Sequence, residues 1–123
     1  MWCNEHVSDE QKDLAESILR AVGLALWVDS EDLMDSVTAL SGSGPAYFFL
    51  MLEALESAGE QLGLPGETAR LLALQTAFGA ARMALESEDD AATLRPRVTS
   101  PGGTTEAALK VMEDGGLREL MKK

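Results

Sequence analysis

The sequence has few residues that carry catalytic or metal chemistry. It contains one cysteine and one histidine, Cys3 and His6, in 123 residues. One cysteine cannot form an internal disulfide, and the two residues together cannot supply the four ligands of a structural zinc site. A Ser-His-Asp or Cys-His arrangement would have to use His6, close to the start of the chain. We therefore expect Cys3 and His6 to have no catalytic or metal-binding role.

Basic residues are also scarce. Ten Lys and Arg stand against 21 Asp and Glu, which gives a formal net charge of -11. Binding of nucleic acid or of an anionic membrane needs clustered Lys and Arg. No apolar run is long enough to span a bilayer, and the chain does not begin like a signal peptide. We therefore expect no nucleic-acid partner and no membrane, and we expect a cytoplasmic location.

What the sequence does contain is a series of helical patterns. Ser8 and Gln11 form a capping box at the start of a helix that we expect to end near Gly23. An extended connector, Leu24–Val28, precedes a helix that Ser30 would cap. The fold class predicted is all-α, and the remaining helices are expected over about 46–64, 65–88, 89–98, 100–114 and 117–123.

Two of these helices are too apolar for a single small domain. Ala46–Leu52 is apolar without a break, and Leu71–Ala81 carries no charge. A helix that is apolar on every side is normally buried on every side. A chain of this length has difficulty burying two such helices, so we expect an obligate dimer with both helices in a shared core.

Two segments combine glycine, proline and hydroxyl residues before a helix. In the sequence SPGGTT, Ser100 is predicted to be the N-cap and Pro101 the first helical residue. The unpaired N–H groups of that first turn, with the hydroxyls of Ser100, Thr104 and Thr105, would form a cradle for a carboxylate or phosphate. A simple N-cap fits the spacing about equally well. Two glycines in place of alanines cost about 1 kcal/mol each, and that cost favours a functional role.

The other charged and glycine-rich features favour simpler interpretations. For Ser41–Pro45 we favour a kink between two helices over an anion site. Arg95 and Arg97 follow one another closely beside the predicted cradle, but such a pair is more often a solvated surface. The carboxylates form no convincing acid/base or metal-binding pair.

Three motifs occur together, and together they resemble a known family. They are TALSGSGPAYFF (Thr38–Phe49), LGLP (Leu62–Pro65) and VTSPGGTTEAAL (Val98–Leu109). In this combination the chain resembles the C-terminal domain of pyrroline-5-carboxylate reductases from about Val7 to Lys123. The resemblance implies a helical bundle of the 6-phosphogluconate dehydrogenase C-terminal-like type. It also implies an interlocked homodimer that often assembles into decamers, preceded by an N-terminal Rossmann domain.

The same resemblance implies a reaction and a site. The reaction is the reduction of 1-pyrroline-5-carboxylate to L-proline by NADPH or NADH, the last step of proline biosynthesis. Thr105 would be the catalytic hydroxyl that hydrogen-bonds the ring nitrogen, and Val98 would line the ring. The residues implied for the substrate are Val98, Ser100, Gly103, Thr104 and Thr105. Those implied to lie near the nicotinamide are Thr38, Ser41, Gly42, Ser43, Gly44 and Pro45.

The sequence also departs from the family's plan. It has no Gly-x-Gly-x-x-Gly turn after a strand, so the Rossmann domain is absent from these residues. Residues 1–7 resemble the linker that leaves that domain, and residues 8–123 form the helical dimerisation and substrate-binding domain. We expect this chain alone to bind no dinucleotide tightly and to be inactive. Two alternatives remain open: a non-catalytic helical oligomerisation or regulatory module, and a domain of a related imine or keto-acid reductase.

Overall fold

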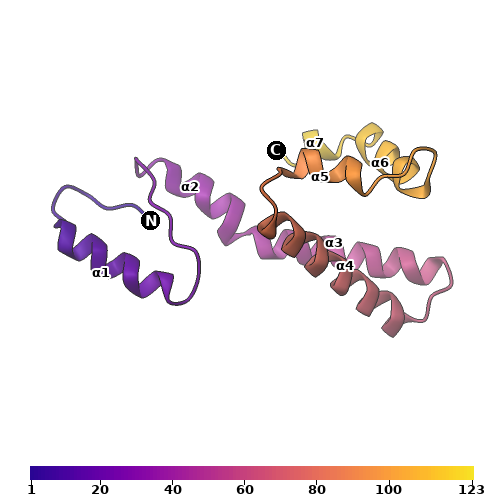
Figure 1. Cartoon of the computed structure of the whole chain (residues 1–123), viewed down its shortest axis with the longest axis horizontal. Coiled ribbons are helices and arrows are strands. Elements are labelled where there is room, and N and C mark those ends of the chain that lie inside the picture. Colours follow the sequence, from indigo (N-terminus) through magenta and orange to yellow (C-terminus); the bar gives the residue numbers. More distant parts are fainter. The chain divides into compact units, whose positions relative to one another are not determined.

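The computed structural model describes all 123 residues, and every regular element is a helix, which confirms the all-α prediction (Figure 1). None of the helices combines the length and the apolar character that a membrane span requires. The chain divides into two units, Met1–Gly66 and Glu67–Lys123. The elements are α1 (Asp9–Arg20), α2 (Leu33–Val37), the π-helical turn η1 (Thr38–Gly42), α3 (Gly44–Gln61), α4 (Gly66–Glu86), α5 (Ala91–Arg97), α6 (Thr104–Asp114) and α7 (Leu117–Leu120).

Helix α1 begins as its sequence predicts. The backbone N–H of Gln11 donates to the Ser8 hydroxyl over 3.3 Å, and the Gln11 side chain accepts from the Ser8 N–H over 2.9 Å. This reciprocal pair satisfies two donors that the first turn cannot pair internally. The helix ends at Arg20 with Ala21 as its C-cap, before the predicted stop at Gly23.

The connector after α1 is fastened to the helix by polar contacts. The Trp27 indole N–H donates to Glu16 Oε2 over 2.7 Å, and Arg20 Nε donates to Glu16 Oε1 over 2.7 Å. Both hydrogen bonds lower the pKa of the Glu16 carboxyl below its ordinary value, and the bond from Trp27 has the larger effect. On the other side of the connector, the Val28 N–H donates to the Met1 carbonyl over 2.9 Å.

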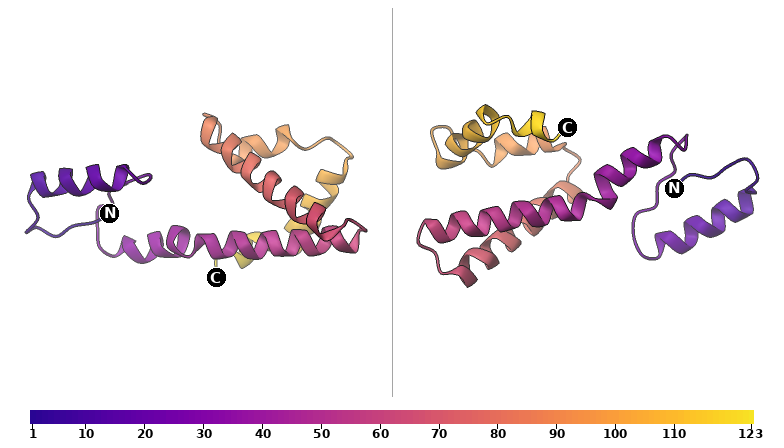
Figure 2. Two further views of the ribbon diagram at one scale, coloured as in Figure 1. Left: turned by 90° about the horizontal axis from the view of Figure 1, so that it is seen from below. Right: turned by 180° about the vertical axis from the view of Figure 1, so that it is seen from behind.

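Helices α2 and α3 follow one another almost without a break (Figure 2). The turn η1 continues α2 directly, and only Ser43 separates η1 from α3. The Ser43 N–H donates to the Thr38 carbonyl over 2.8 Å, five residues back, which is the hydrogen bond of a π turn. At the kink that was predicted between the two helices, the structure has a π turn. Ser30 does not cap α2, because Asp32 is the N-cap and no side chain bonds to the helix start.

The segment Leu62–Pro65 forms the turn that ends α3 and leads to α4. Gly63 has a φ of +96°, which favours glycine because it lacks a Cβ. Its N–H donates to the Glu60 carbonyl over 2.9 Å, and the Leu64 N–H donates to the Gly59 carbonyl over 3.1 Å. These two bonds are those of a Schellman motif, so the turn before α4 is specified locally.

The apolar helices remain exposed in a single chain. Phe49 on α3 is 68% exposed and Phe78 on α4 is 60% exposed. The only buried apolar residues are Ala25, Ala69 and Ala73. One copy of the chain therefore does not supply the core that Ala46–Leu52 and Leu71–Ala81 need.

In the second unit, ion pairs connect the short helices α5, α6 and α7. Arg95 Nη1 on α5 lies 3.2 Å from Glu113 Oε1 on α6. Arg118 Nε on α7 lies 2.8 Å from Glu113 Oε2. The hydrogen bond from Arg118 lowers the pKa of the Glu113 carboxyl. The chain reverses between α6 and α7 at Gly116, which has a φ of +77°.

Candidate carboxylate-binding site

The segment before α6 is a tight turn. The Gly103 N–H donates to the Ser100 carbonyl over 3.0 Å, and Gly102 has a φ of +71°. Proline in the second position and a positive φ at glycine in the third are the signature of a type II turn. The helix begins at Thr104, with Gly103 as its N-cap. The predicted start at Pro101, with Ser100 as the N-cap, is therefore wrong, because Ser100–Gly103 is used by the turn.

The turn also accounts for both glycines. Gly102 occupies the left-handed region, where a Cβ causes strain. A Cβ on Gly103 would lie 3.0 Å from the Ser100 carbonyl oxygen. The cost of two glycines is thus explained by the turn itself, and it no longer argues for a ligand.

Donors without partners gather at the start of α6. The first intrahelical bond is that of the Ala107 N–H, so the N–H groups of Thr104, Thr105 and Glu106 have no partner in the chain. No hydrogen bond uses the hydroxyls of Ser100, Thr104 or Thr105, and these three residues are exposed. They lie at the positive end of an 11-residue helix. This arrangement can bind an anion such as a carboxylate.

The two other residues predicted for the substrate differ in what they offer. Gly103 contributes no free donor, because its N–H is held by Ser100. Val98, the C-cap residue of α5, is 59% exposed and presents an apolar side chain beside the turn. The N–H groups of Thr104 and Thr105 are therefore without a partner at the helix start, whereas the Gly103 N–H is used by the turn.

Sequence reasoning missed Glu106. Its Oε2 accepts from the Gly102 N–H over 2.7 Å, so a carboxylate lies against the turn. Glu106 is the third residue of α6, where a capping-box glutamate reaches back to the helix start. That spacing is visible in the sequence, but only when Gly103, and not Ser100, is taken as the N-cap.

The two arginines near the turn are paired elsewhere. Arg95 binds Glu113 on α6, and Arg97 binds Asp89 before α5. These ion pairs agree with the solvated-surface interpretation. Because both arginines are paired with carboxylates, the positive potential that would attract an anion comes from the start of α6.

The second predicted set, Thr38 and Ser41–Pro45, lies in the first unit. The Thr38 and Ser41 hydroxyls donate to the carbonyls four residues back, over 2.9 Å and 2.7 Å. Their oxygens can still accept a hydrogen bond from a ligand. Pro45 lies in the first turn of α3, as expected from its missing N–H.

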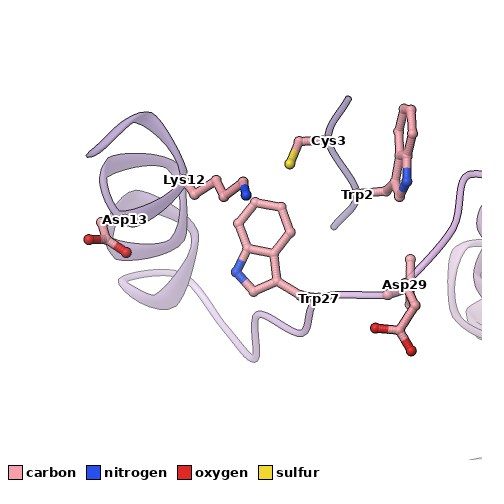
Figure 3. A pocket seen from close by; sticks show the side chains of 7 residues that line it. Trp2, Cys3, Lys12, Asp13, Trp27 and Asp29 are labelled. Carbon is pink, nitrogen blue, oxygen red and sulfur yellow. The ribbon is translucent and has the colours of Figure 1, made fainter. Parts of the chain in front are cut away.

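A pocket lies elsewhere, between α1 and the connector (Figure 3). Its volume is about 340 Å³. The Lys12 side chain extends from α1 toward the Trp27 ring, and Cys3 and Asp13 are among the other residues that line the pocket (Figure 3). None of the predicted site residues lines it. No group of His, Cys, Asp and Glu in the chain could hold a metal ion.

Comparison with known proteins identifies the family. Residues 31–123 match the protein family described as "Pyrroline-5-carboxylate reductase dimerisation". A pyrroline-5-carboxylate reductase of Pseudomonas aeruginosa is 56% identical over 122 residues, which are 99% of this chain and 45% of that protein. One of Synechocystis is 48% identical over 115 residues, 94% of this chain and 43% of that protein.

Solved structures agree with these relatives. A pyrroline-5-carboxylate reductase of Coxiella burnetii has a TM-score of 0.93 and 63% identity, over 98% of this chain and 44% of that chain. A pyrroline carboxylate reductase of Plasmodium falciparum with NADP bound has a TM-score of 0.88 and 33% identity, over 97% of this chain and 47% of that one. The chain spans less than half the length of these relatives. By the match over residues 31–123, it belongs to the pyrroline-5-carboxylate reductase dimerisation family.

Proposed function

We propose that this chain is the dimerisation and substrate-binding domain of an NAD(P)H-dependent pyrroline-5-carboxylate reductase, which reduces 1-pyrroline-5-carboxylate to L-proline. The observation that carries the proposal is the group of unpartnered donors at the start of α6. The N–H groups of Thr104 and Thr105 and the nearby hydroxyls suit the carboxylate that this substrate carries. The motif match over Val98–Leu109 and the names of the relatives support the choice of substrate.

The proposed site needs few acids or bases. A cyclic imine is readily protonated, and the iminium carbon then accepts hydride. The carboxylate is held by the N–H groups of Thr104 and Thr105 and by the Ser100 and Thr104 hydroxyls. Each charged hydrogen bond contributes about 1.5–3 kcal/mol. The Thr105 hydroxyl bonds the ring nitrogen and Val98 contacts the ring, so the substrate is held in one orientation.

The nicotinamide cofactor supplies the hydride when it is bound. This chain fits only a small part of it. The Thr38 and Ser41 oxygens retain lone pairs that can accept from the nicotinamide carboxamide, and Gly42–Pro45 allow close approach of the backbone. No Gly-x-Gly-x-x-Gly segment is present for the phosphates. Dinucleotide binding is therefore assigned to residues outside these 123, with Met1–Val7 as the linker to them.

Two copies of the chain would form the dimer. The exposed apolar side chains of α3 and α4, Phe49 and Phe78 among them, need a cover that one chain lacks. The family match to a dimerisation domain supports a second copy as that cover. A decamer is the further assembly that the motif resemblance implies. The single cysteine suits the cytoplasm, where disulfides are rare.

The test is two-substrate kinetics on the whole gene product with Thr105→Val. Removing the hydroxyl should lower kcat/KM for the imine by roughly one to two powers of ten. The KM for NAD(P)H should not change, because Thr105 would contact only the imine. Thr68→Val, an exposed threonine in the first turn of α4, is the matched control and should behave as wild type. Unchanged efficiency for the imine with weakened NAD(P)H binding would refute the assignment.

The 123-residue chain gives a second test. Without a dinucleotide-binding segment it should catalyse no measurable NAD(P)H-dependent reduction. Turnover by the purified chain at rates typical of enzymes, about 1 s⁻¹ or more, would contradict the proposed division of roles.

A further inference from the structure

The turn before α6 is held to the helix by one side chain, that of Glu106. Its Oε2 accepts from the Gly102 N–H over 2.7 Å. We propose that Glu106 is a positioning residue that fixes the Ser100–Gly103 turn for the substrate carboxylate. This inference rests on the proposed function of that turn.

Few contacts determine the orientation of the turn. The bond from the Gly103 N–H to the Ser100 carbonyl lies within the turn and does not orient it relative to α6. Gly102, at a φ of +71°, has no side chain to pack. The Ala107 N–H donates to the Gly103 carbonyl where the turn meets the helix, and the bond from Gly102 to Glu106 is the only side-chain bond that joins the turn to the first turn of the helix.

The opposite end of the segment is fixed independently. The Thr99 hydroxyl donates to the Arg95 carbonyl over 2.7 Å, and the Thr99 N–H donates to the Pro96 carbonyl over 3.1 Å. These bonds fasten the segment to α5. Thr99 and Glu106 thus hold the turn from its two sides. Loss of Glu106 would free one side, so that the Ser100 hydroxyl and the donors of Thr104 and Thr105 would no longer be held in one arrangement.

The charge of Glu106 opposes its positioning role. A carboxylate beside the helix start repels the carboxylate of the substrate, whereas its oxygen is what holds Gly102 in place. Glutamine keeps an acceptor oxygen and loses the charge, and alanine loses both. Comparing the two substitutions therefore separates the effect of the acceptor oxygen, which positions the turn, from the effect of the charge.

The experiment measures imine kinetics in the whole gene product with Glu106→Ala and Glu106→Gln. Glu106→Ala should raise the KM for the imine roughly tenfold, with a smaller change in kcat, because the donors are misplaced. Glu106→Gln should have a KM equal to or below that of wild type. Glu10→Ala, an acid in the first turn of α1 where Ser8 and Gln11 provide the cap, is the control and should not change kinetics.

A second readout does not depend on activity. In protein labelled with ¹⁵N-glycine, the Gly102 amide signal should move in Glu106→Ala and stay near its wild-type position in Glu106→Gln. An unmoved Gly102 signal, a wild-type KM in Glu106→Ala, or equal damage from both substitutions would overturn the inference. Thr105→Val in the same series separates the two proposals. If it alone impairs imine kinetics, only the role of Glu106 is wrong, and if it has no effect, the proposed function is wrong.

Discussion

The segments Ser41–Pro45 and Ser100–Thr105 each combine two glycines and one proline with hydroxyl residues, and they fold differently. The first continues a helix through a π turn, and all its glycines have negative φ. The second interrupts the chain with a type II turn at Gly102. One cause is the residue before each proline. A side chain before proline disfavours the helical region, and Gly44 relieves that restriction, whereas Ser100 does not.

This difference decides which polar groups are available to a ligand. In the first segment the Thr38 and Ser41 hydroxyls donate to the helix that contains them. In the second, the N–H groups of Thr104 and Thr105 have no partner. Similar composition therefore gives one segment that offers mainly acceptors and one that offers donors, and only the second suits an anion.

The helices that follow the two segments also differ, because α3 carries exposed apolar side chains that are proposed for the dimer core. A negative charge on α3 should therefore have the largest effect on the protein. Phe49→Glu on α3 would bury an unpaired charge in the proposed dimer core. We expect the dimer to dissociate or unfold, with loss of the species of twice 13.1 kDa in sedimentation at micromolar concentration.

Gln61→Glu at the polar end of α3 introduces the same charge and should leave the dimer intact. A wild-type chain that sediments as a stable monomer and binds no hydrophobic dye would contradict the need for a partner.

Replacing one glycine of each segment by alanine should change the free energy of unfolding by different amounts, because the two glycines differ in backbone geometry. Gly102→Ala places a Cβ at a φ of +71°, which should reduce the free energy of unfolding by about 1–2 kcal/mol. Gly44→Ala lies in a helix with no atom beyond its chain neighbours within 4 Å of the new Cβ, but the added side chain precedes Pro45, so the gain in helix propensity is opposed and the free energy of unfolding should change by less than about 1 kcal/mol. Urea denaturation measures both. Equal effects would mean that the two segments share one geometry in solution.

The smallest expected effect concerns pH and the first unit alone. The hydrogen bond from Trp27 lowers the pKa of Glu16, so this contact contributes stability above the ordinary glutamate value of about 4.3. That stability is lost as the pH falls below this value and through the lowered pKa. In a Trp2→Phe background, Trp27 fluorescence should change over this acidic range. Glu16→Gln should remove the transition, and a transition that persists in Glu16→Gln would assign it to another group.

Much of the fold could be predicted because its signals are local. The capping box of Ser8 and Gln11 and the apolar pattern of α3 and α4 depend on residues a few positions apart. The start of α6 could not, because proline has the same φ at the first position of a helix and at the second position of a type II turn. The positive φ of Gly102 decides between them, and neither Ser100 nor Pro101 reveals it.

The candidate site was predictable to the same degree. Hydroxyls and a helix start are readable from SPGGTT, so the donors of Thr104 and Thr105 were expected. The bond from Glu106 to Gly102 depends on where the helix begins, and the pairing of Arg95 with Glu113 joins residues on different helices. Neither contact follows from local composition.

A crystal structure of the whole gene product with L-proline and NADP tests the central contrast most directly. We expect a proline carboxylate oxygen within about 2.7–3.2 Å of the backbone nitrogens of Thr104 and Thr105. We also expect the nicotinamide to lie beside Ser41–Pro45. A proline carboxylate bound instead at Ser41–Pro45, with the dinucleotide at the start of α6, would contradict both expectations.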